Sequence, residues 1–392
     1  LRPLAPYQLA FPFPAVEVFP ADAVPLRAAT PELSMAGFAV QRTGVTPAMA
    51  GACGTMRQAA SASRAMLLSA AARTWSVPAA ELQVEQGVIV HAASGRRAPY
   101  GQFVKVAASL PVPKDAPVKA RDAFQLIGHE GVVRVDAAGK VDGSAVYTQD
   151  VKLPGMLVAV VAYPSRRWSR VRHFDASAAL AISGVAAVVE LPGDHEVQGG
   201  VAVLAHNTWI ARQGRDALVI DWDTEHALDV DTDRLFERFR TLASMPGPVA
   251  VHRGSAIGKV PGGGRSFEGV YEQPYLSHSP MEPMNCLVRM NADGCEMWNG
   301  EQWHTADQAA VAAELGLKPA QVRIHQVYAG GSFGRRANPR SDYVRATARI
   351  LKAARAQGVD APIKLVWMRE DDTHAMQYRP TTVHRVHAAT DA

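Results

Sequence analysis

The sequence has 392 residues, of which 48% are hydrophobic and 20% are charged. These proportions are ordinary for a globular protein, and the length predicts roughly two or three domains. A net charge of +4 without a polybasic run, together with only 7% aromatic residues, argues against a nucleic-acid-binding surface.

The three cysteines, Cys53, Cys286 and Cys295, lie far apart in the sequence. They match neither a disulfide framework nor a CxxC metal motif, and they are too few for an iron–sulfur cluster, which usually needs a full set of thiolate ligands. No apolar stretch approaches the roughly 20 residues of a membrane span. The first residues also lack the charged-then-apolar order of a secretory signal peptide. An iron–sulfur cluster is therefore not expected on this chain.

The first part of the chain predicts one helix and a hairpin. Residues 1–50 are rich in proline and alanine and show little periodicity, which predicts irregular structure. Apolar residues recur at helical spacing over residues 56–75. Residues 82–110 then predict a strand, a turn at Gln86-Gly87, a second strand and a short helix. The proline-rich segment 111–119 is typical of a linker.

The middle of the chain, from about residue 124 to 220, alternates short β-branched strands with an alanine-rich helix. A second helix is expected over residues 207–217. This alternation predicts a mixed α/β unit. From about residue 235 onward, strand patterns occur at 286–291, 321–328 and 363–370.

Two helices are expected among these last strands. The first should begin at Thr305, because Gln308 lies three residues later, as in a capping box. It should end at Gly316, where a glycine stop belongs. The second covers residues 341–358, in which apolar residues again recur at helical spacing.

A glycine-rich stretch, YAGGSFGRR, occupies Tyr328 to Arg336 and joins the strand at 321–328 to the helix at 341–358. The run 330–334 (Gly330, Gly331, Ser332, Phe333 and Gly334) removes side chains that would keep a ligand from the backbone N–H groups. Arg335 and Arg336 then lie before a helix start, where the macrodipole disfavours positive charge. An anion bound there would resolve this conflict.

The residues alone leave two interpretations of this stretch open, an anion-binding loop and a tight turn with two solvated arginines. It is not a Walker A loop, because no Gly-Lys-Ser/Thr follows. It is not a GxGxxG fingerprint either, because the glycine spacing differs.

Three further stretches accompany the glycine-rich one: HSPMEPMN at 278–285, EMWNGEQW at 296–303 and WMREDDTHAMQYRP at 367–380. In this order they resemble the molybdenum-binding subunit of the xanthine dehydrogenase and aldehyde oxidase superfamily, and most of all the branch formed by the isoquinoline 1-oxidoreductase beta subunits. The segment KVDGSAVYTQDVKLPGML at 140–157 is similar to the opening of the family's hammerhead domain. The resemblance covers essentially the whole chain and is most specific from Leu126 onward.

The resemblance implies an α+β, mixed α/β fold that combines the hammerhead domain with part of the molybdopterin-binding domain. The expected boundaries are 1–115 for a first molybdopterin-binding segment, 116–230 for the hammerhead domain and 231–392 for the segment with the glycine-rich loop.

The resemblance also implies site residues. Gln302 matches the glutamine whose amide faces an oxo ligand of molybdenum, and an amide can donate there without adding charge. Residues 330–336, from Gly330 to Arg336, match the loop that approaches the cofactor, with Ser332 in place of the more usual glycine. Glu282 is a candidate charged group at or beside the site, and a solvated or capping role for it stays open.

The function implied is molybdenum hydroxylase chemistry on an N-heteroaromatic ring or an aldehyde, with oxygen derived from water. The cofactor would be molybdenum held by the dithiolene of molybdopterin cytosine dinucleotide, with no protein ligand to the metal. Expected partners are a small [2Fe-2S] subunit and a cytochrome c subunit, and a periplasmic or membrane-associated location through those partners is expected. The alternatives are an aldehyde dehydrogenase of the same branch coupled to cytochrome c, and a non-catalytic cofactor-binding or assembly module.

The sequence departs from the family in three places. No GVGE-type segment supplies the family's catalytic glutamate, no GQG-type loop is found, and the stretch near Thr43 reads TGVTPAMA rather than a GGSTS-like sequence. Together with the start at Leu1, these departures lead us to expect a piece of a longer chain, or a site completed by a second polypeptide. We expect such a chain to be inactive when it is alone.

Other metal or hydrolase chemistry finds little support. Asp371, Asp372 and His374 cluster near one strand end, which favours a charge network over a hard-metal site. Cys286 is expected to be a small core residue. Neither an HExxH motif nor a GxSxG elbow is present in the sequence.

Overall fold

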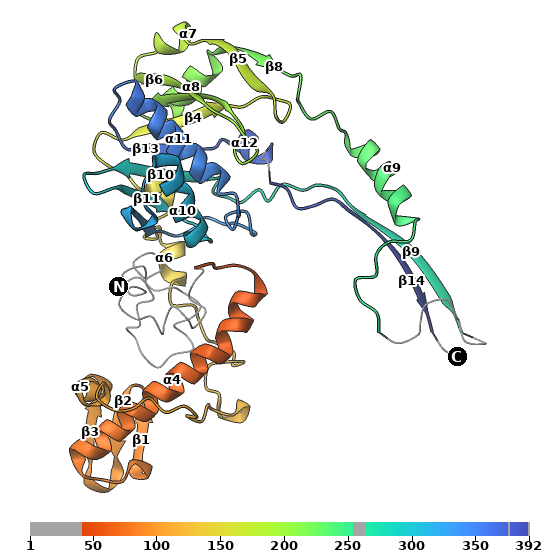
Figure 1. Ribbon diagram of the computed structural model, residues 1–392. Helices are drawn as coiled ribbons and strands as arrows, with labels where there is room; N and C mark the ends of the chain where they lie inside the picture. The colour runs from red at the N-terminus through yellow and green to blue at the C-terminus, as the bar shows by residue number, and fades with distance from the viewer. Residues whose placement is uncertain (1–40, 254–263, 375–376, 391–392) are drawn as a thin grey trace. The chain divides into compact units, whose positions relative to one another are not determined.

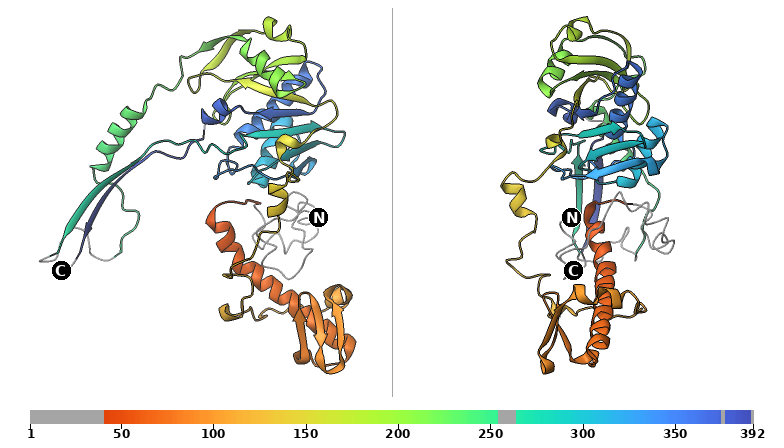
Figure 2. Two further views of the ribbon diagram at one scale, coloured as in Figure 1. Left: turned by 180° about the vertical axis from the view of Figure 1, so that it is seen from behind. Right: turned by 90° about the vertical axis from the view of Figure 1, so that its left-hand side faces the viewer.

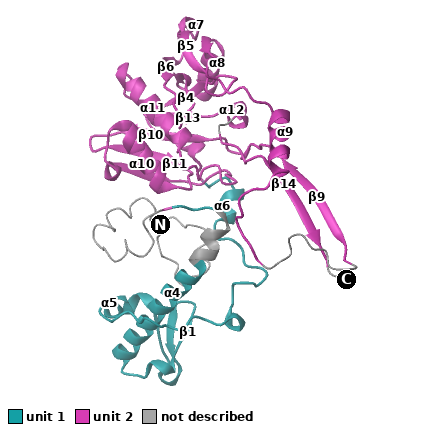
Figure 3. Cartoon of the chain, turned by 45° about the vertical axis from the view of Figure 1, so that its right-hand side comes forward, with its two compact units in different colours: residues 1–29, 42–145 teal, residues 30–41, 146–392 magenta. Residues whose placement is uncertain are grey.

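The structure is a computed structural model, and it describes residues 41–253, 264–374 and 377–390. The chain divides into two compact units, residues 1–29 with 42–145 and residues 30–41 with 146–392 (Figure 3). The main division thus lies near residue 145 rather than near the expected boundary at 115. The irregular structure expected for residues 1–40 lies outside the described residues, and residues 45–50 are helical instead.

Unit 1 is built on a long helix and a three-stranded antiparallel sheet with the order β1-β2-β3. The elements are α4 (Val45–Trp75), β1 (Leu82–Glu85), β2 (Val88–His91), β3 (Arg96–Pro99) and α5 (Val104–Ala107). The predicted turn is confirmed, because Gln86 and Gly87 both have positive φ, at 47° and 84°. The predicted helix is confirmed as well and begins earlier than its apolar stripe.

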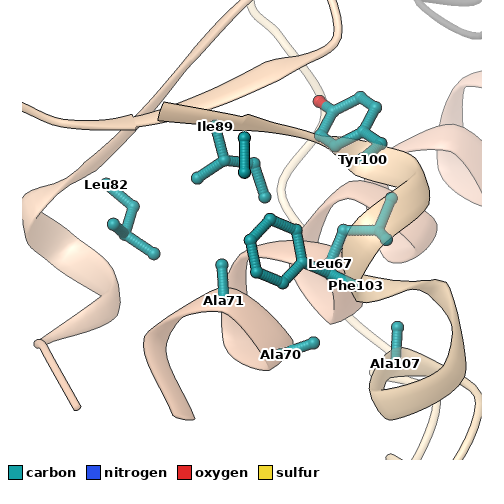
Figure 4. Close-up of a cluster of buried hydrophobic side chains, with 9 residues drawn as sticks. Leu67, Ala70, Ala71, Leu82, Ile89, Tyr100, Phe103 and Ala107 are labelled. Carbon is teal, nitrogen blue, oxygen red and sulfur yellow. The ribbon is translucent and has the colours of Figure 1, made fainter. Parts of the chain in front are cut away.

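The core of unit 1 forms where the apolar face of α4 meets the sheet and the short helical turns after it (Figure 4). Phe103 lies at its centre and contacts Trp75 edge-on, with 5.2 Å between the ring centroids. The buried side chains are Leu67, Ala70, Ala71, Leu82, Ile89, Ala98, Tyr100, Phe103 and Ala107.

Unit 2 contains a mixed seven-stranded sheet with the order β12-β11-β10-β13-β4-β7-β6 (Figures 1 and 2). Its strands are β4 (Leu157–Ala162), β6 (Val185–Leu191), β7 (Gly200–Ala205), β10 (Asn285–Met290), β11 (Cys295–Asn299), β12 (Val322–Gln326) and β13 (Ile363–Val366). β4 pairs in parallel with β13, so this one sheet runs across the domain boundary expected at 230. β4 and β7 are wholly or almost wholly buried, which suits their continuous apolar sequences.

Three helices pack on this sheet: α8 (Thr208–Asp216), α10 (His304–Leu315) and α11 (Asp342–Ala356). The positions predicted for α8 and α11 are confirmed. The side chain of Asn207 caps α8 by accepting a hydrogen bond from the N–H of Ile210, at 2.9 Å.

The capping box predicted at Thr305 is wrong. α10 begins at His304, and Gln308 donates to the carbonyl oxygen of Val322 at 2.9 Å instead of reaching back to a cap. The hydroxyl of Thr305 accepts from the N–H of Gln41, at 2.6 Å. The predicted stop is confirmed, because Gly316 ends α10 in the left-handed region, with φ at 69°.

Smaller elements complete unit 2. They are β5 (Arg170–Asp175), α7 (Ser177–Leu180), β8 (Val219–Asp223), α9 (Thr232–Ala243), β9 (Ser266–Gln273), α12 (Arg369–Thr373) and β14 (Thr382–Ala389). β5 pairs with β8, and β9 pairs with β14 over its full length, as Figures 1 and 2 both show. None of the helices in the described part of the chain is both long and apolar enough to cross a membrane.

Candidate functional site

The glycine-rich loop connects β12 to α11, as predicted, and has an unusual backbone. Gly331, Phe333 and Gly334 all have positive φ, at 101°, 53° and 95°. A turn is closed by the N–H of Arg335, which donates to the carbonyl oxygen of Ser332 at 3.0 Å. The two glycines suit a conformation that other residues rarely adopt, and the side chain of Phe333 is 75% exposed.

Glu282 holds the start of this loop. Its carboxylate accepts hydrogen bonds from the N–H of Gly330 at 2.8 Å and from Nη2 of Arg336 at 3.1 Å. Its own N–H donates to the carbonyl oxygen of Gly330 at 2.9 Å. A Cβ placed on Gly330 would lie only 2.4 Å from the Cβ of Glu282, so position 330 has no room for a side chain. Glu282 is thus a buried partner of the loop and not a solvated turn acid.

Both arginines of the loop are buried, with exposed fractions of 2% for Arg335 and 1% for Arg336. Arg336 donates from Nε to the carbonyl oxygen of Gly331 at 3.1 Å and pairs with Glu282. Arg335 forms a bidentate pair with Asp342, at 3.1 and 2.6 Å. Burial opposes the charge of Arg335, yet Asp342 raises the pKa of that guanidinium above its usual value.

The expected conflict between the arginines and the start of α11 is therefore resolved within the chain. Asp342 is the first residue of α11, and its carboxylate suits both the macrodipole and Arg335. In the structure the arginines hold the loop in shape through carboxylates, and the solvated arginines of the tight-turn interpretation are not found. What the loop can offer to a ligand is mainly its backbone.

Gln302 lies beside the loop, three residues after the end of β11. The hydroxyl of Ser332 donates to Oε1 of Gln302, and the same hydroxyl oxygen accepts from the N–H of Arg336 at 3.0 Å. The structure thus brings Gln302, Glu282 and residues 330–336 together, although they come from three stretches of the sequence.

A turn at residues 147–150 braces the site, and the sequence analysis did not identify these residues. Thr148 accepts the N–H of Gly300 at 3.0 Å, and the N–H of Gln149 donates to Oε1 of Glu282 at 3.3 Å. Nζ of Lys364 donates to the carbonyl oxygens of Gln149 and Val151, at 2.9 and 2.5 Å. The KVDG…Y..D pattern marked this segment, but nothing in its spacing indicated that it contacts the glycine-rich loop.

Lys364 gives a pH-dependent prediction. Burial is the main cause that lowers its pKa from 10.5 to about 8. Between these values the unfolded chain binds a proton that the folded chain does not, so this residue makes the free energy of unfolding rise with pH from about 8 to about 10.5. Lys364→Met should lack that rise, and above about pH 10.5 it should be the less stable protein, because two carbonyls lose their donor. Urea unfolding of both proteins at several pH values measures the difference. If the free energies of unfolding of the two proteins change with pH in the same way, the prediction is contradicted.

The acidic cluster near α12 is a charge network, as the sequence analysis favoured. Asp372 pairs with Arg369 at 3.0 Å, and Asp371 accepts the N–H of Met368 at 2.8 Å. Burial raises the pKa of Asp371 to about 6. Within residues 41–253, 264–374 and 377–390, no group of three or more His, Cys, Asp or Glu side chains could hold a metal ion. Cys286 is fully buried in β10, and burial raises the pKa of its thiol well above the usual value.

The loop has the features of a cradle for a polyanionic group. The backbone N–H groups of residues 331–334 have no hydrogen-bond partner among the described residues. A Cβ built on Gly334 would meet no atom within 4 Å, so the backbone there is open to a ligand. Nη1 of Arg336 is also buried without a partner in the described part of the chain. Consecutive bare N–H groups of this kind suit phosphate oxygens and other anions, so the residues present fit a pterin cofactor with its phosphates.

Comparisons with known proteins give a family match that contains this loop. Residues 257–392 match the molybdopterin cofactor-binding domain family. The chain is 28% identical to the beta subunit of isoquinoline 1-oxidoreductase from Brevundimonas diminuta, over 90% of this chain and 49% of that protein. It is also 28% identical to the membrane-bound aldehyde dehydrogenase [pyrroloquinoline-quinone] of Gluconacetobacter polyoxogenes, over 86% of this chain and 44% of that protein. A nicotinate dehydrogenase subunit of Pseudomonas putida is 26% identical, over 81% of this chain and 26% of that protein.

The chain spans about half the length of the first two relatives and about a quarter of the third. The family match at residues 257–392 includes the glycine-rich loop. The similarity to the Brevundimonas diminuta protein covers 90% of the chain and so reaches both compact units. Residues 257–392 therefore carry a molybdopterin cofactor-binding domain, and over most of its length the chain is similar to an isoquinoline 1-oxidoreductase beta subunit.

Proposed function

We propose that this chain is the cofactor-binding part of a molybdenum-dependent oxidoreductase that hydroxylates an N-heteroaromatic ring or oxidises an aldehyde with oxygen from water. The observation that carries the proposal is the bare run of four N–H groups at residues 331–334, held beside Gln302 within the matched domain. The names of the relatives support this choice of substrates, since they include an isoquinoline oxidoreductase and an aldehyde dehydrogenase.

Each part of the site has a separate task in this proposal. The cofactor, when bound, supplies a redox-active molybdenum centre. The N–H groups of residues 331–334 bind the anionic part of the cofactor, and the pair of Arg336 with Glu282 keeps the loop in shape. Gln302 supplies a neutral amide donor close to the reacting group. Positioning and electrostatics are thus the protein's contribution to the chemistry.

The remaining features of the proposal follow from the family resemblance. The cofactor is the cytosine dinucleotide form of molybdopterin, and residues 116–230 correspond to the hammerhead domain. Electrons leave through a small [2Fe-2S] subunit, with a cytochrome c subunit as the acceptor in the aldehyde dehydrogenase variant. The complex is periplasmic or membrane-associated through these partners.

Metal and cofactor analysis of the protein, co-expressed with its partner subunits, tests the proposal. We expect molybdenum and a pterin that releases cytidine monophosphate on hydrolysis. Pyrroloquinoline quinone without molybdenum would overturn it. A loaded complex with no turnover of aldehydes or N-heteroaromatics would instead support a non-catalytic module.

A matched pair of glycine variants tests the role of the loop. Gly334 and Gly358 both have positive φ, at 95° and 85°, and neither has an atom within 4 Å of a built Cβ. Valine should strain the backbone similarly at the two positions. Gly334→Val should lose most of the molybdenum, because its side chain enters the space of the ligand, whereas Gly358→Val, at the end of α11, should keep it. Equal molybdenum content in the two variants would mean that the loop is only a turn.

Gly331→Val would be a less direct test of ligand contact. A Cβ at Gly331 lies 3.2 Å from the Cβ of Pro280, so a side chain there presses on the neighbouring segment of the chain. With φ at 101°, the substitution also strains the backbone. It should therefore lower cofactor retention mainly by deforming the loop.

A further inference from the structure

We propose that Glu301 and Asp307 form a buried pair of one carboxylic acid and one carboxylate, which keeps a proton at neutral pH, and that this proton fastens the backbone segment before Gln302 to α10. Glu301 is then a positioning residue, because it acts through the segment in which Gln302 lies. The pair itself does not depend on the proposed function of the chain, whereas its consequence for Gln302 does.

Two buried carboxyl groups contact each other at the start of α10. Glu301, between β11 and α10, is 4% exposed, and Asp307, in the first turn of α10, is 2% exposed. Their side chains are hydrogen-bonded to each other. An ionised carboxylate can only accept hydrogen bonds, so two ionised groups in this contact would repel each other. One of the two therefore carries a proton and donates it to the other.

The surroundings of Glu301 offer it no cation among the described residues. The ring of His304 comes closest, with Nε2 at 3.6 Å from Oε1 of Glu301. That nitrogen lies 2.6 Å from Oε1 of Gln326, to which it donates, and burial lowers the pKa of His304 to about 4, so the ring is neutral at pH 7. Without a proton on the pair, Oε1 of Glu301 and Oδ2 of Asp307 would both be buried without a donor in the described part of the chain.

Further titratable groups face the pair from β10 and α11. They are Cys286, Asp342, Tyr343 and Arg345. Burial raises the pKa values of the Cys286 thiol and the Tyr343 hydroxyl, so both stay neutral. Arg345 favours the ionised form of Asp307 more directly than that of Glu301, and burial together with the charge of Asp307 raises the pKa of Glu301 well above its usual value. The proton therefore resides on Glu301, and Asp307 accepts it in the hydrogen bond.

The backbone before Gln302 is packed against the start of the glycine-rich loop. The N–H of Gly300 donates to Oγ1 of Thr148 at 3.0 Å. A Cβ built on Gly300 would lie 2.6 Å from the carbonyl oxygen of Tyr328, so the two backbones are in close contact. Protonated Glu301 ties this segment to α10. When the proton leaves to the solvent, two carboxylates remain in a buried contact, and their repulsion pushes the segment away from the helix.

Infrared difference spectroscopy of the full chain detects the proton directly. Ordinary aspartate and glutamate side chains are ionised at about pH 7, so the band of a protonated carboxyl marks an unusual group. We expect this band in the wild type and its loss in Glu301→Gln, whose amide keeps the shape and can still donate to Asp307. Glu272→Gln is the control, because the hydrogen bond from Arg240 lowers the pKa of Glu272, and it should leave the band unchanged. A band of equal strength in the wild type and Glu301→Gln would overturn the inference.

The pH dependence of unfolding gives a second measurement. From about pH 5 to about pH 7 the unfolded chain has lost the proton of Glu301 and the folded chain keeps it, so the free energy of unfolding of the wild type should fall as pH rises. Relative to Glu301→Gln, the unfolding equilibrium constant of the wild type should rise by about tenfold per pH unit, which is the effect of one proton. The same pH dependence in both proteins would also overturn the inference.

Hydrogen exchange at residues 300–302 tests the positioning. At a pH high enough to remove the carboxyl band, these amides should exchange faster in the wild type than in Glu301→Gln at the same pH, and at neutral pH the two proteins should exchange alike. Loss of the band without faster exchange would mean that the proton does not hold the segment, and the inference would fail. None of these measurements needs the cofactor, so a wild-type complex without molybdenum would overturn the proposed function and leave the pair intact.

Discussion

Glu282→Ala should destabilise unit 2 by about 3–5 kcal/mol, the cost of removing one partner of a buried ion pair. The variant leaves the guanidinium of Arg336, which is 1% exposed, without its carboxylate. It also leaves the N–H groups of Gly330 and Gln149 without an acceptor. Denaturant unfolding measures the loss, and molybdenum content should fall with it because the loop is no longer held.

Glu282→Gln is the matched control for this experiment. Its amide oxygen still accepts a hydrogen bond from one backbone N–H, and its shape is almost unchanged, so only the charge opposite Arg336 is removed. We expect the free energy of unfolding of Glu282→Gln to lie between those of the wild type and Glu282→Ala. If Glu282→Ala unfolds at the wild-type denaturant concentration and keeps its cofactor, Glu282 does not organise the loop, and its proposed role beside the reacting group becomes the better explanation of its burial.

Gln302→Ala should lower kcat of the assembled enzyme by roughly 10²–10³-fold, because one oriented neutral donor beside the reacting group is lost. The free energy of unfolding should change far less, since Gln302 is only partly buried. Gln357→Ala is a suitable control, because that side chain donates to the carbonyl oxygen of Val188 at the far end of α11. Its turnover should equal that of the wild type. Turnover of Gln302→Ala within a few-fold of the wild type would show that Gln302 is not beside the reacting group.

The sequence predicted the local elements well wherever one signal dominated. The stripes of α4 and α11, the turn at Gln86-Gly87 and the glycine stop at Gly316 all depend on neighbouring residues, and each is confirmed. The predicted cap at Thr305 failed because a long-range contact with Gln41 takes the hydroxyl. Helix α9 was missed, although Asp231 provides its cap.

The sequence indicated which residues belong to the site, but not which of them contact one another. Gly330 and Glu282 were both candidates, but only their folded contact shows that a Cβ at 330 would collide with Glu282. The pairing of Arg336 with Glu282 joins residues 54 positions apart. Lys364 and Gln149 are 215 positions apart, and no local pattern indicates that one holds the other.

The parallel pairing of β4 with β13 has a consequence for synthesis of the protein. Leu157 on β4 pairs with Ile363 on β13, so one edge of β4 stays without its partner while about 200 further residues are made. At about 5–20 residues per second, that interval lasts roughly 10–40 s. β7 covers the other edge of β4 much sooner, because Val158 pairs with Ala205. During the interval the apolar strand LVAVVA presents an open edge, which is a template for aggregation. Folding of unit 2 in the cell is therefore expected to depend on a chaperone that shields this edge until β13 arrives.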